Sequence, residues 1–253
     1  MKSMTYDELK RIVESAGTLE GWDFAQVKAD RDPVLWNYVD VVRQYLKPTD
    51  RVLDIGTGGG EIFLSLSPYF GEGVGVDQNP KMIETARRNL STQSVDNVTL
   101  MRMEGDALRF DGAEFDVVLI RHLRVYASEV VRVLRPGGYF ITQTVGQRSS
   151  LNFLDAFGWT PASFGPDWWQ PVAELAEQFR QHGCYIVAQA ENDVPYWFHD
   201  IESFIFWLMS VPWPEKIKLE KHWQNINQIL ETAQTRRGIE TNEHRGLLIV
   251  QKL

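Results

Sequence analysis

The amino-acid sequence predicts an α/β protein built on a mostly parallel seven-stranded sheet with helices on both faces. From Arg51 onward, short apolar runs alternate with stretches of helical pattern, which is typical of a parallel sheet wrapped by helices. The composition agrees, because 253 residues that are 43% hydrophobic and 24% charged suffice for one sizeable core. N-terminal helices and a helical insertion before the last strand complete the predicted fold.

The N-terminal part is predicted to be helical. Thr5 and Glu8 fit a capping box, which opens a short amphipathic helix over about residues 6–16. Asp32-Pro33 then supplies an N-cap followed by proline at the first helical position, so a second helix is expected to run to about Leu46. We expect one domain over 1–253, with a helical cap at 1–47.

The sheet core is expected over 48–192 and 243–253. Its strands are predicted near 51–55, 73–77, 97–102, 115–121, 138–145, 184–191 and 246–251. Helices are predicted between them near 60–69, 80–90, 126–134 and 167–182. Residues 193–242 are expected to form a helical insertion or lid, with a further helix near 215–236.

An aromatic segment, VPYWFHDIESFIFWLMSVPWP at 194–214, lies within this insertion. Prolines, Asp200 and Glu202 interrupt it, so it does not fit a membrane span of about 20 mostly apolar residues. Asp200 can cap a helix running to about Val211 that is apolar on all sides and therefore needs cover on more than one face. We expect this helix to lie across the carboxyl edge of the sheet.

The charge and cysteine content exclude some classes of function. A net charge of −8 and a pI near 5.2 argue against a general nucleic-acid binder, which depends on Lys and Arg. Cys184 is the single cysteine, so no intrachain disulfide or cysteine metal cluster is possible, and no metal site is expected. The N-terminus lacks an apolar signal core, which predicts a cytoplasmic location. The oligomeric state is left open.

The strongest local signal is the loop RVLDIGTGGGE at 51–61, where a strand near Asp54 leads into a glycine-rich turn and a helix. Nineteen residues after Gly58, Asp77 ends the next strand, where a carboxylate can accept hydrogen bonds from both ribose hydroxyls. Met82 follows one turn into the next helix. A nicotinamide-binding loop would need Gly or Ala where this chain has Glu61, whose charge would repel a pyrophosphate.

These segments, with EGDA at 104–107, FDVVLIRH at 115–122 and RVLRPGGYFI at 132–141, resemble the ordered motifs of class I S-adenosylmethionine (SAM)-dependent methyltransferases. The later half is similar to uncharacterised bacterial members that act on small molecules. The resemblance implies a Rossmann-like fold, SAM as cofactor and S-adenosyl-L-homocysteine as product. The cofactor-binding residues that it implies are Asp54, Gly56, Thr57, Gly58, Gly60, Glu61, Asp77, Gln78, Met82, Gly105, Asp106, Ala107 and Arg121.

Catalytic and substrate-binding residues are less closely specified. A proton acceptor near the cleft could be His122, His199 or Tyr196, placed there by chain order. The substrate candidates are the aromatic and polar residues Trp22, Phe24, Tyr196, Trp197 and His199. Aromatic faces can attract a sulfonium by cation–π interaction, but the same side chains could equally fill a satellite core.

The acceptor is expected to be a small, partly apolar molecule, with nucleic acid and membrane unlikely as partners. The fourth strand ends in Ile120-Arg121-His122 rather than the Asn-Pro-Pro-Tyr signature for amino groups of bases, and Cys184 cannot support a two-cysteine mechanism. Two alternatives remain. One is an RNA or protein methyltransferase, whose mark would be a contiguous basic surface that includes Arg121, Arg124 and Arg148. The other is a non-catalytic SAM- or nucleoside-binding module.

Overall fold

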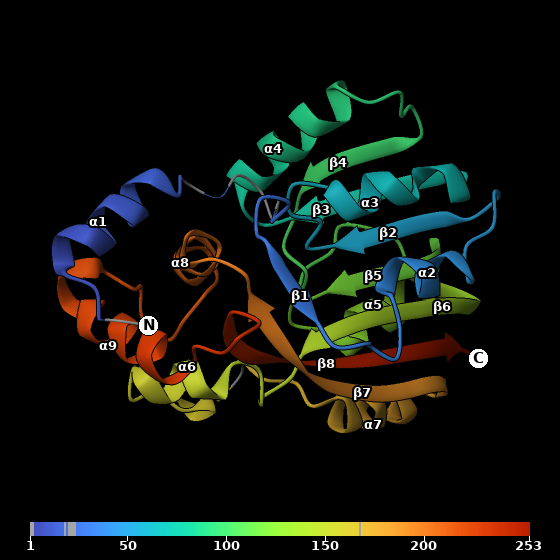
Figure 1. Cartoon of the computed structure of the whole chain (residues 1–253). Helices are drawn as coiled ribbons and strands as arrows, with labels where there is room; N and C mark the ends of the chain where they lie inside the picture. Colours follow the sequence, from blue (N-terminus) through green and yellow to red (C-terminus); the bar gives the residue numbers. More distant parts are fainter. Residues whose placement is uncertain (1–2, 18, 20–23, 167) are drawn as a thin grey trace.

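The computed structural model describes residues 3–17, 19, 24–166 and 168–253, and its centre is a single mixed sheet (Figure 1). Within these residues the sheet has eight strands in the order β1-β7-β8-β6-β5-β2-β3-β4. The strands are β1 (Ala29–Arg31), β2 (Arg51–Ile55), β3 (Glu72–Asp77), β4 (Val98–Arg102), β5 (Phe115–Arg121), β6 (Leu134–Val145), β7 (Cys184–Phe198) and β8 (Ile239–Lys252).

The expectation of a mostly parallel seven-stranded sheet is wrong in two respects. Strands β4, β3, β2, β5 and β6 form a parallel set, but β8 pairs antiparallel with β6 and β7, and β1 pairs antiparallel with β7. The eighth strand, β1, has three residues and shows no periodicity in the sequence. Its pairing with the end of β7, Ala29 opposite Phe198, is a contact between distant segments.

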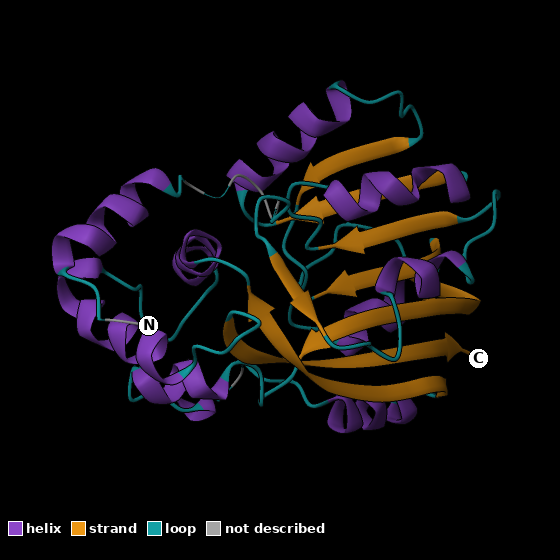
Figure 2. Cartoon of the chain, viewed as in Figure 1, coloured by secondary structure: helices purple, strands orange, loops and turns teal. Residues whose placement is uncertain are grey.

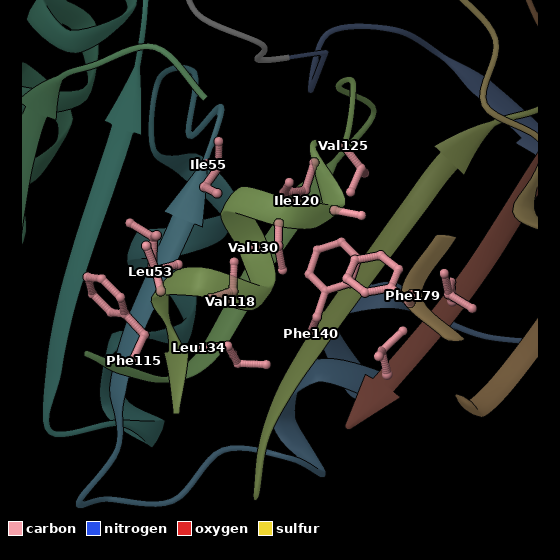
Figure 3. Packing of buried hydrophobic residues seen from close by; sticks show 14 of the residues in the cluster. Leu53, Ile55, Phe115, Val118, Ile120, Val125, Val130, Leu134, Phe140 and Phe179 are labelled. Carbon is pink, nitrogen blue, oxygen red and sulfur yellow. The ribbon is translucent and has the colours of Figure 1, made fainter. Parts of the chain in front are cut away.

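Helices cover both faces of the parallel set, as expected. Helices α2 (Tyr38–Arg43), α3 (Glu61–Leu66) and α4 (Pro80–Ser91) lie on one face, with the 3-10 turn η1 (Ser67–Tyr69) after α3, while α5 (Ala127–Val133) and α7 (Val172–Gln181) lie on the other (Figure 1). Figure 3 shows the second face, where Val118, Val130 and Leu134 pack together. Phe140 stacks on Phe179 there, with ring centroids 4.9 Å apart.

A helical lobe lies beside the carboxyl ends of the parallel strands (Figure 2). We define it as α1 (Tyr6–Ser15), α6 (Leu151–Ala156), α8 (Ile201–Ser210) and α9 (Leu219–Thr232); the short turn η2 (Pro161–Phe164) follows α6. Its core contains Phe153, Phe204 and Leu208, each fully buried, packed against Phe198 of β7. The predicted caps of α1 by Thr5 and of α8 by Asp200 are both confirmed.

Two element boundaries differ from the prediction. Strand β7 continues through Tyr196 to Phe198 and β8 already begins at Ile239, so the helical part of the insertion is shorter than expected. The helix expected from Asp32 begins instead at Tyr38, with Asn37 as its N-cap, because residues 29–31 are held in the sheet. None of the helices in the described ranges is long and apolar enough to span a bilayer.

Candidate functional site

The glycine-rich loop lies between the end of β2 and the start of α3 and folds tightly over the end of β3. The backbone N–H groups of Gly56 and Thr57 both donate to the carbonyl of Val76, at 2.8 and 2.9 Å. Gly56 has a φ of +76°, and a side chain there would lie 2.6 Å from a methyl carbon of Leu123. The positive φ and this close contact together require glycine at this position.

Asp77, at the end of β3, holds this loop in place. Its Oδ2 accepts from the N–H of Gly58 at 3.0 Å, and its Oδ1 accepts from the N–H of Asn79 at 2.8 Å. A carboxylate offers about four acceptor positions, so two remain for a ligand's hydroxyl groups. Gln78 follows Asp77 directly, and Met82 lies in the first turn of α4. Arg102, opposite Asp77 in the sheet, precedes Gly105, Asp106 and Ala107, so these predicted residues gather at one sheet edge.

Asp54, on β2, carries a perturbed charge at the same edge. Burial raises the pKa of its carboxyl from 3.8 to about 6, the Thr57 hydroxyl and Arg121 lower it, and Asp77 raises it further. The protein therefore destabilises the charged form of Asp54 in the absence of a ligand. A bound cation next to this carboxylate would relieve that cost.

A pocket of about 190 Å³ adjoins this edge, on the face of the sheet that α2 covers. One wall of the pocket consists of polar side chains from the sheet. Arg121 ends β5 and pairs with Gln143 of β6. Arg245 of β8 pairs with Asn192 of β7, and Glu243 lies two residues from Arg245 on the same face. Facing these polar side chains are Trp36, Tyr38 and Ile62. The pocket thus has one polar and one largely apolar wall.

Known proteins share this arrangement of loop and strands over part of the chain. Residues 52–138 match the family model described as a methyltransferase domain. Together with the relatives and structures below, this match supports a class I SAM-dependent methyltransferase. The chain is 36% identical over 98 residues to the uncharacterized methyltransferase YcgJ of Bacillus subtilis. The aligned segment is 36% of this chain and 39% of YcgJ.

Other similarities are more distant. A ubiquinone/menaquinone biosynthesis C-methyltransferase, UbiE of Zymomonas mobilis, is 26% identical over 165 residues, or 62% of this chain and 64% of UbiE. The crystal structure of YcgJ superposes with a TM-score of 0.62 at 20% identity over 85% of this chain and 97% of YcgJ. The [4+2]-cyclase SpnF superposes with a TM-score of 0.59 at 15% identity, over 85% of this chain and 80% of SpnF. These structures share the fold of this chain.

His122 lines the pocket and has a defined tautomer. The Trp36 indole N–H can only donate, and it donates to Gln143 Oε1 at 2.9 Å. The Gln143 amide therefore donates to His122 Nε2, also at 2.9 Å, so the ring proton must lie on Nδ1. Desolvation, followed by the charges of Arg245 and Arg121, holds the pKa of His122 well below its usual value. His122 is thus neutral, and the lone pair on its Nε2 already accepts the hydrogen bond from Gln143.

The other predicted catalytic and substrate residues are spread over two faces of β7. Tyr196 is on the pocket side, and burial, then Glu243, raises its pKa to about 12. Trp197 points to the opposite face, where it donates to Glu240 and stacks under Arg237. His199 lies near Asp30 on that same face rather than in the pocket lining. Phe24 packs against Phe206 of the lobe, and Trp22 falls outside the described residues.

Tyr38 is a site residue that the sequence reasoning missed. Its side chain is 7% exposed, and its hydroxyl has no hydrogen-bond partner among the described residues. Burial, followed by the charge of Asp54, raises its pKa, whereas Arg121 lowers it. Tyr38 also lines the pocket, so its hydroxyl interacts with the charges of Asp54 and Arg121 at the site. The available signal was Trp36-Asn37-Tyr38, in which aromatic residues flank an N-cap.

We expect Tyr38→Phe to separate stability from binding. Removing a buried hydroxyl without a partner should leave Tm unchanged or raise it, because such a group costs about 1–3 kcal/mol. SAM affinity should fall roughly 3–10-fold, the effect of losing one hydrogen bond to a ligand. Thermal unfolding and calorimetric titration measure the two effects. Tyr45→Phe, which alters a tyrosine packed on Tyr139, is the control. If Tyr38→Phe lowered Tm and left SAM affinity unchanged, the assignment of the Tyr38 hydroxyl to ligand binding would be wrong.

Proposed function

We propose that this chain binds SAM across the glycine-rich loop and transfers its methyl group to a small molecule held in the adjacent pocket. The observation that carries the proposal is the position of Asp77, which anchors the loop at Gly58 and keeps free acceptor positions. The pocket supports it, because it opens at the carboxyl ends of β5 and β6, where open α/β sheets bind their ligands.

The residues at the loop fit SAM better than a dinucleotide. Asp77 would bind the ribose hydroxyls, and the Asp54 carboxylate would bind the cofactor's ammonium group. The backbone of Gly56, Thr57, Gly58 and Gly60 would line the loop side. A side chain at Gly59 would collide with the Glu61 carboxylate, which therefore lies against the loop where a pyrophosphate would need to bind. The adenine would lie between Met82, Gln78, Gly105, Asp106 and Ala107.

SAM supplies a methyl group on a sulfonium, which is already a good leaving group. The work of the chain is therefore to position the acceptor in line with that methyl group and to exclude water. His122, neutral and protonated on Nδ1, would donate a hydrogen bond to the acceptor rather than remove a proton. Arg121 would lie between cofactor and acceptor, as the last residue of β5.

A small acceptor is favoured over a macromolecule. A pocket of about 190 Å³ is smaller than the roughly 300–1,000 Å³ typical of sites for drug-sized ligands. An RNA or protein substrate would need a contiguous basic surface. Arg148, named above as a candidate for it, instead makes ion pairs with Asp193 and Glu191. The fold alone does not fix the reaction, since a [4+2]-cyclase shares it.

Parallel calorimetric titrations with SAM, S-adenosylhomocysteine and NAD test the proposal. We expect micromolar binding of the first two and none of NAD. Incubation with radiolabelled SAM and a panel of small acceptors should then yield a labelled product. Binding of NAD, or of no adenosyl ligand, would refute the cofactor assignment. Equal binding of SAM and its product without turnover on any acceptor would favour the non-catalytic module.

A further inference from the structure

The polar wall of the pocket is positively charged in a chain whose net charge is −8. Three arginines line it, Arg31, Arg121 and Arg245, together with a single carboxylate, Glu243. They come from β1, β5 and β8, so the sheet itself gathers them from distant parts of the sequence. The lining therefore has a formal excess of two positive charges.

The strand register explains why these side chains meet. Arg245 and Glu243 are two residues apart on β8 and so point to the same face. On the neighbouring strand, Tyr196 of β7 pairs with Arg31 of β1, which brings Arg31 to the same side. Glu243 accepts from Arg245 Nη2 at 2.9 Å through one oxygen and pairs with Arg31 through the other. One carboxylate thus holds two guanidinium groups together.

Glu243 does not neutralise the cluster. Arg121 makes no hydrogen bond or ion pair with any residue that the structure describes and interacts with the Asp54 carboxylate only at longer range, and the other two arginines share one acid. Burial lowers the pKa of Arg245; Glu243 raises it, but Arg121 and Arg31 lower it further. Like charges are therefore held close together on a half-buried wall. Arg guanidinium groups bind carboxylates bidentately, and an anion there would relieve this repulsion.

We propose that the methyl acceptor is a small organic acid whose carboxylate binds at the Arg31–Glu243–Arg245 end of the pocket. This inference rests on the proposed function and specifies its substrate class. Strand β8 is two strands from β5 in the sheet, about 10 Å at the usual spacing. The methyl group would be delivered beside β5, so the atom that is methylated lies several bonds from the carboxylate. Trp36 and Tyr38 would contact the apolar body between them.

Two substitutions separate ligand binding from a purely structural ion pair. Arg31→Gln and Glu243→Gln both break the same Arg31–Glu243 pair, so damage to the fold would change the two variants in the same direction. Electrostatics predicts opposite directions for anion binding. Loss of Arg31 removes positive charge and should weaken binding, whereas loss of Glu243 leaves the arginines uncompensated and should strengthen it.

The probe is benzoate, titrated by ligand-observed NMR at low ionic strength, with benzamide as its uncharged analogue and inorganic phosphate as a second anion. We expect benzoate to bind at least about tenfold more tightly than benzamide. Relative to the unmodified chain, the Kd for benzoate should rise roughly 3–10-fold in Arg31→Gln and fall about threefold or more in Glu243→Gln. Arg237→Gln, which breaks ion pairs with Asp30 and Asp32 on the other face of the same strands, should leave it unchanged.

Equal binding of benzoate and benzamide, or a shift in the same direction for both pocket variants, would overturn the proposal. Tighter binding of phosphate than of benzoate would overturn the carboxylate assignment. These titrations are made without cofactor, so they are independent of the SAM titration. If SAM binds and benzoate does not, only the substrate class fails; if benzoate binds and SAM does not, the proposed methyl transfer fails.

Discussion

Asp77→Ala should abolish detectable binding of SAM and S-adenosylhomocysteine. The substitution removes the acceptor for both ribose hydroxyls and also the anchor that holds Gly58 and Asn79. Hydrogen bonds to a charged group contribute about 1.5–3 kcal/mol each, so losing two should weaken binding at least about 100-fold. Calorimetric titration of each ligand measures this loss.

Two further variants test whether the lost ligand binding comes from the Asp77 carboxylate itself. Asp77→Asn keeps the shape and one acceptor oxygen, so its affinity should lie between those of the original chain and the alanine variant. Asp155→Ala removes an exposed carboxylate on α6 and should bind both ligands normally. If Asp77→Ala bound SAM within about threefold of the unmodified chain, the assignment of this residue to the ribose would be wrong.

Asp54→Asn should make the protein more stable and a weaker SAM binder at the same time. The carboxyl of Asp54 has a pKa of about 6 in the folded chain against an ordinary 3.8. Between these values the folded state binds more protons than the unfolded state, so the stability of the original chain falls as pH rises from about 4 to about 6. The asparagine variant lacks this loss, and at pH 7 its free energy of unfolding should be about 1–3 kcal/mol higher.

SAM affinity should show the opposite dependence. A cationic ligand favours the charged form of Asp54, so affinity in the original chain should rise as pH increases through about 6. Asp54→Asn should bind roughly 10–100-fold more weakly at pH 7 and show no rise in this range. Urea unfolding and calorimetry at pH 4, 5, 6 and 7 test both parts. A variant that is destabilised at pH 7, or that keeps the affinity rise, would contradict the assigned role.

The parallel half of the sheet could be predicted from sequence because its signals are local. Strands β2, β3 and β5 are apolar runs, each followed by a turn and a helix, and the loop at Gly56 needs a backbone conformation that only glycine adopts readily. Asp77 could be placed at the site because it ends a strand next to this loop. The carboxyl ends of neighbouring parallel strands meet at one edge of a sheet.

The pocket wall could not be predicted in this way, because long-range register forms it. Arg31 reaches Glu243 only through the pairing of β1 with β7 and of β7 with β8. The expected aromatic enclosure at 196–199 failed for a related reason: on a strand, successive side chains alternate, so Trp197 points away from the face that carries Tyr196. The apolar pattern of the sequence therefore predicts the helical lobe but not the charge of the pocket.

The position of β8 has a consequence for the biosynthesis of the protein. Strand β8 comes last along the chain, yet it lies between β6 and β7 and separates the five parallel strands from the β7–β1 pair. Until residues 239–252 have left the ribosome, β6 has an unpaired edge, and the wall that Arg245 completes does not exist. The parallel strands come from neighbouring segments of the chain, whereas the wall that carries Arg245 forms only once β8 has paired between β6 and β7.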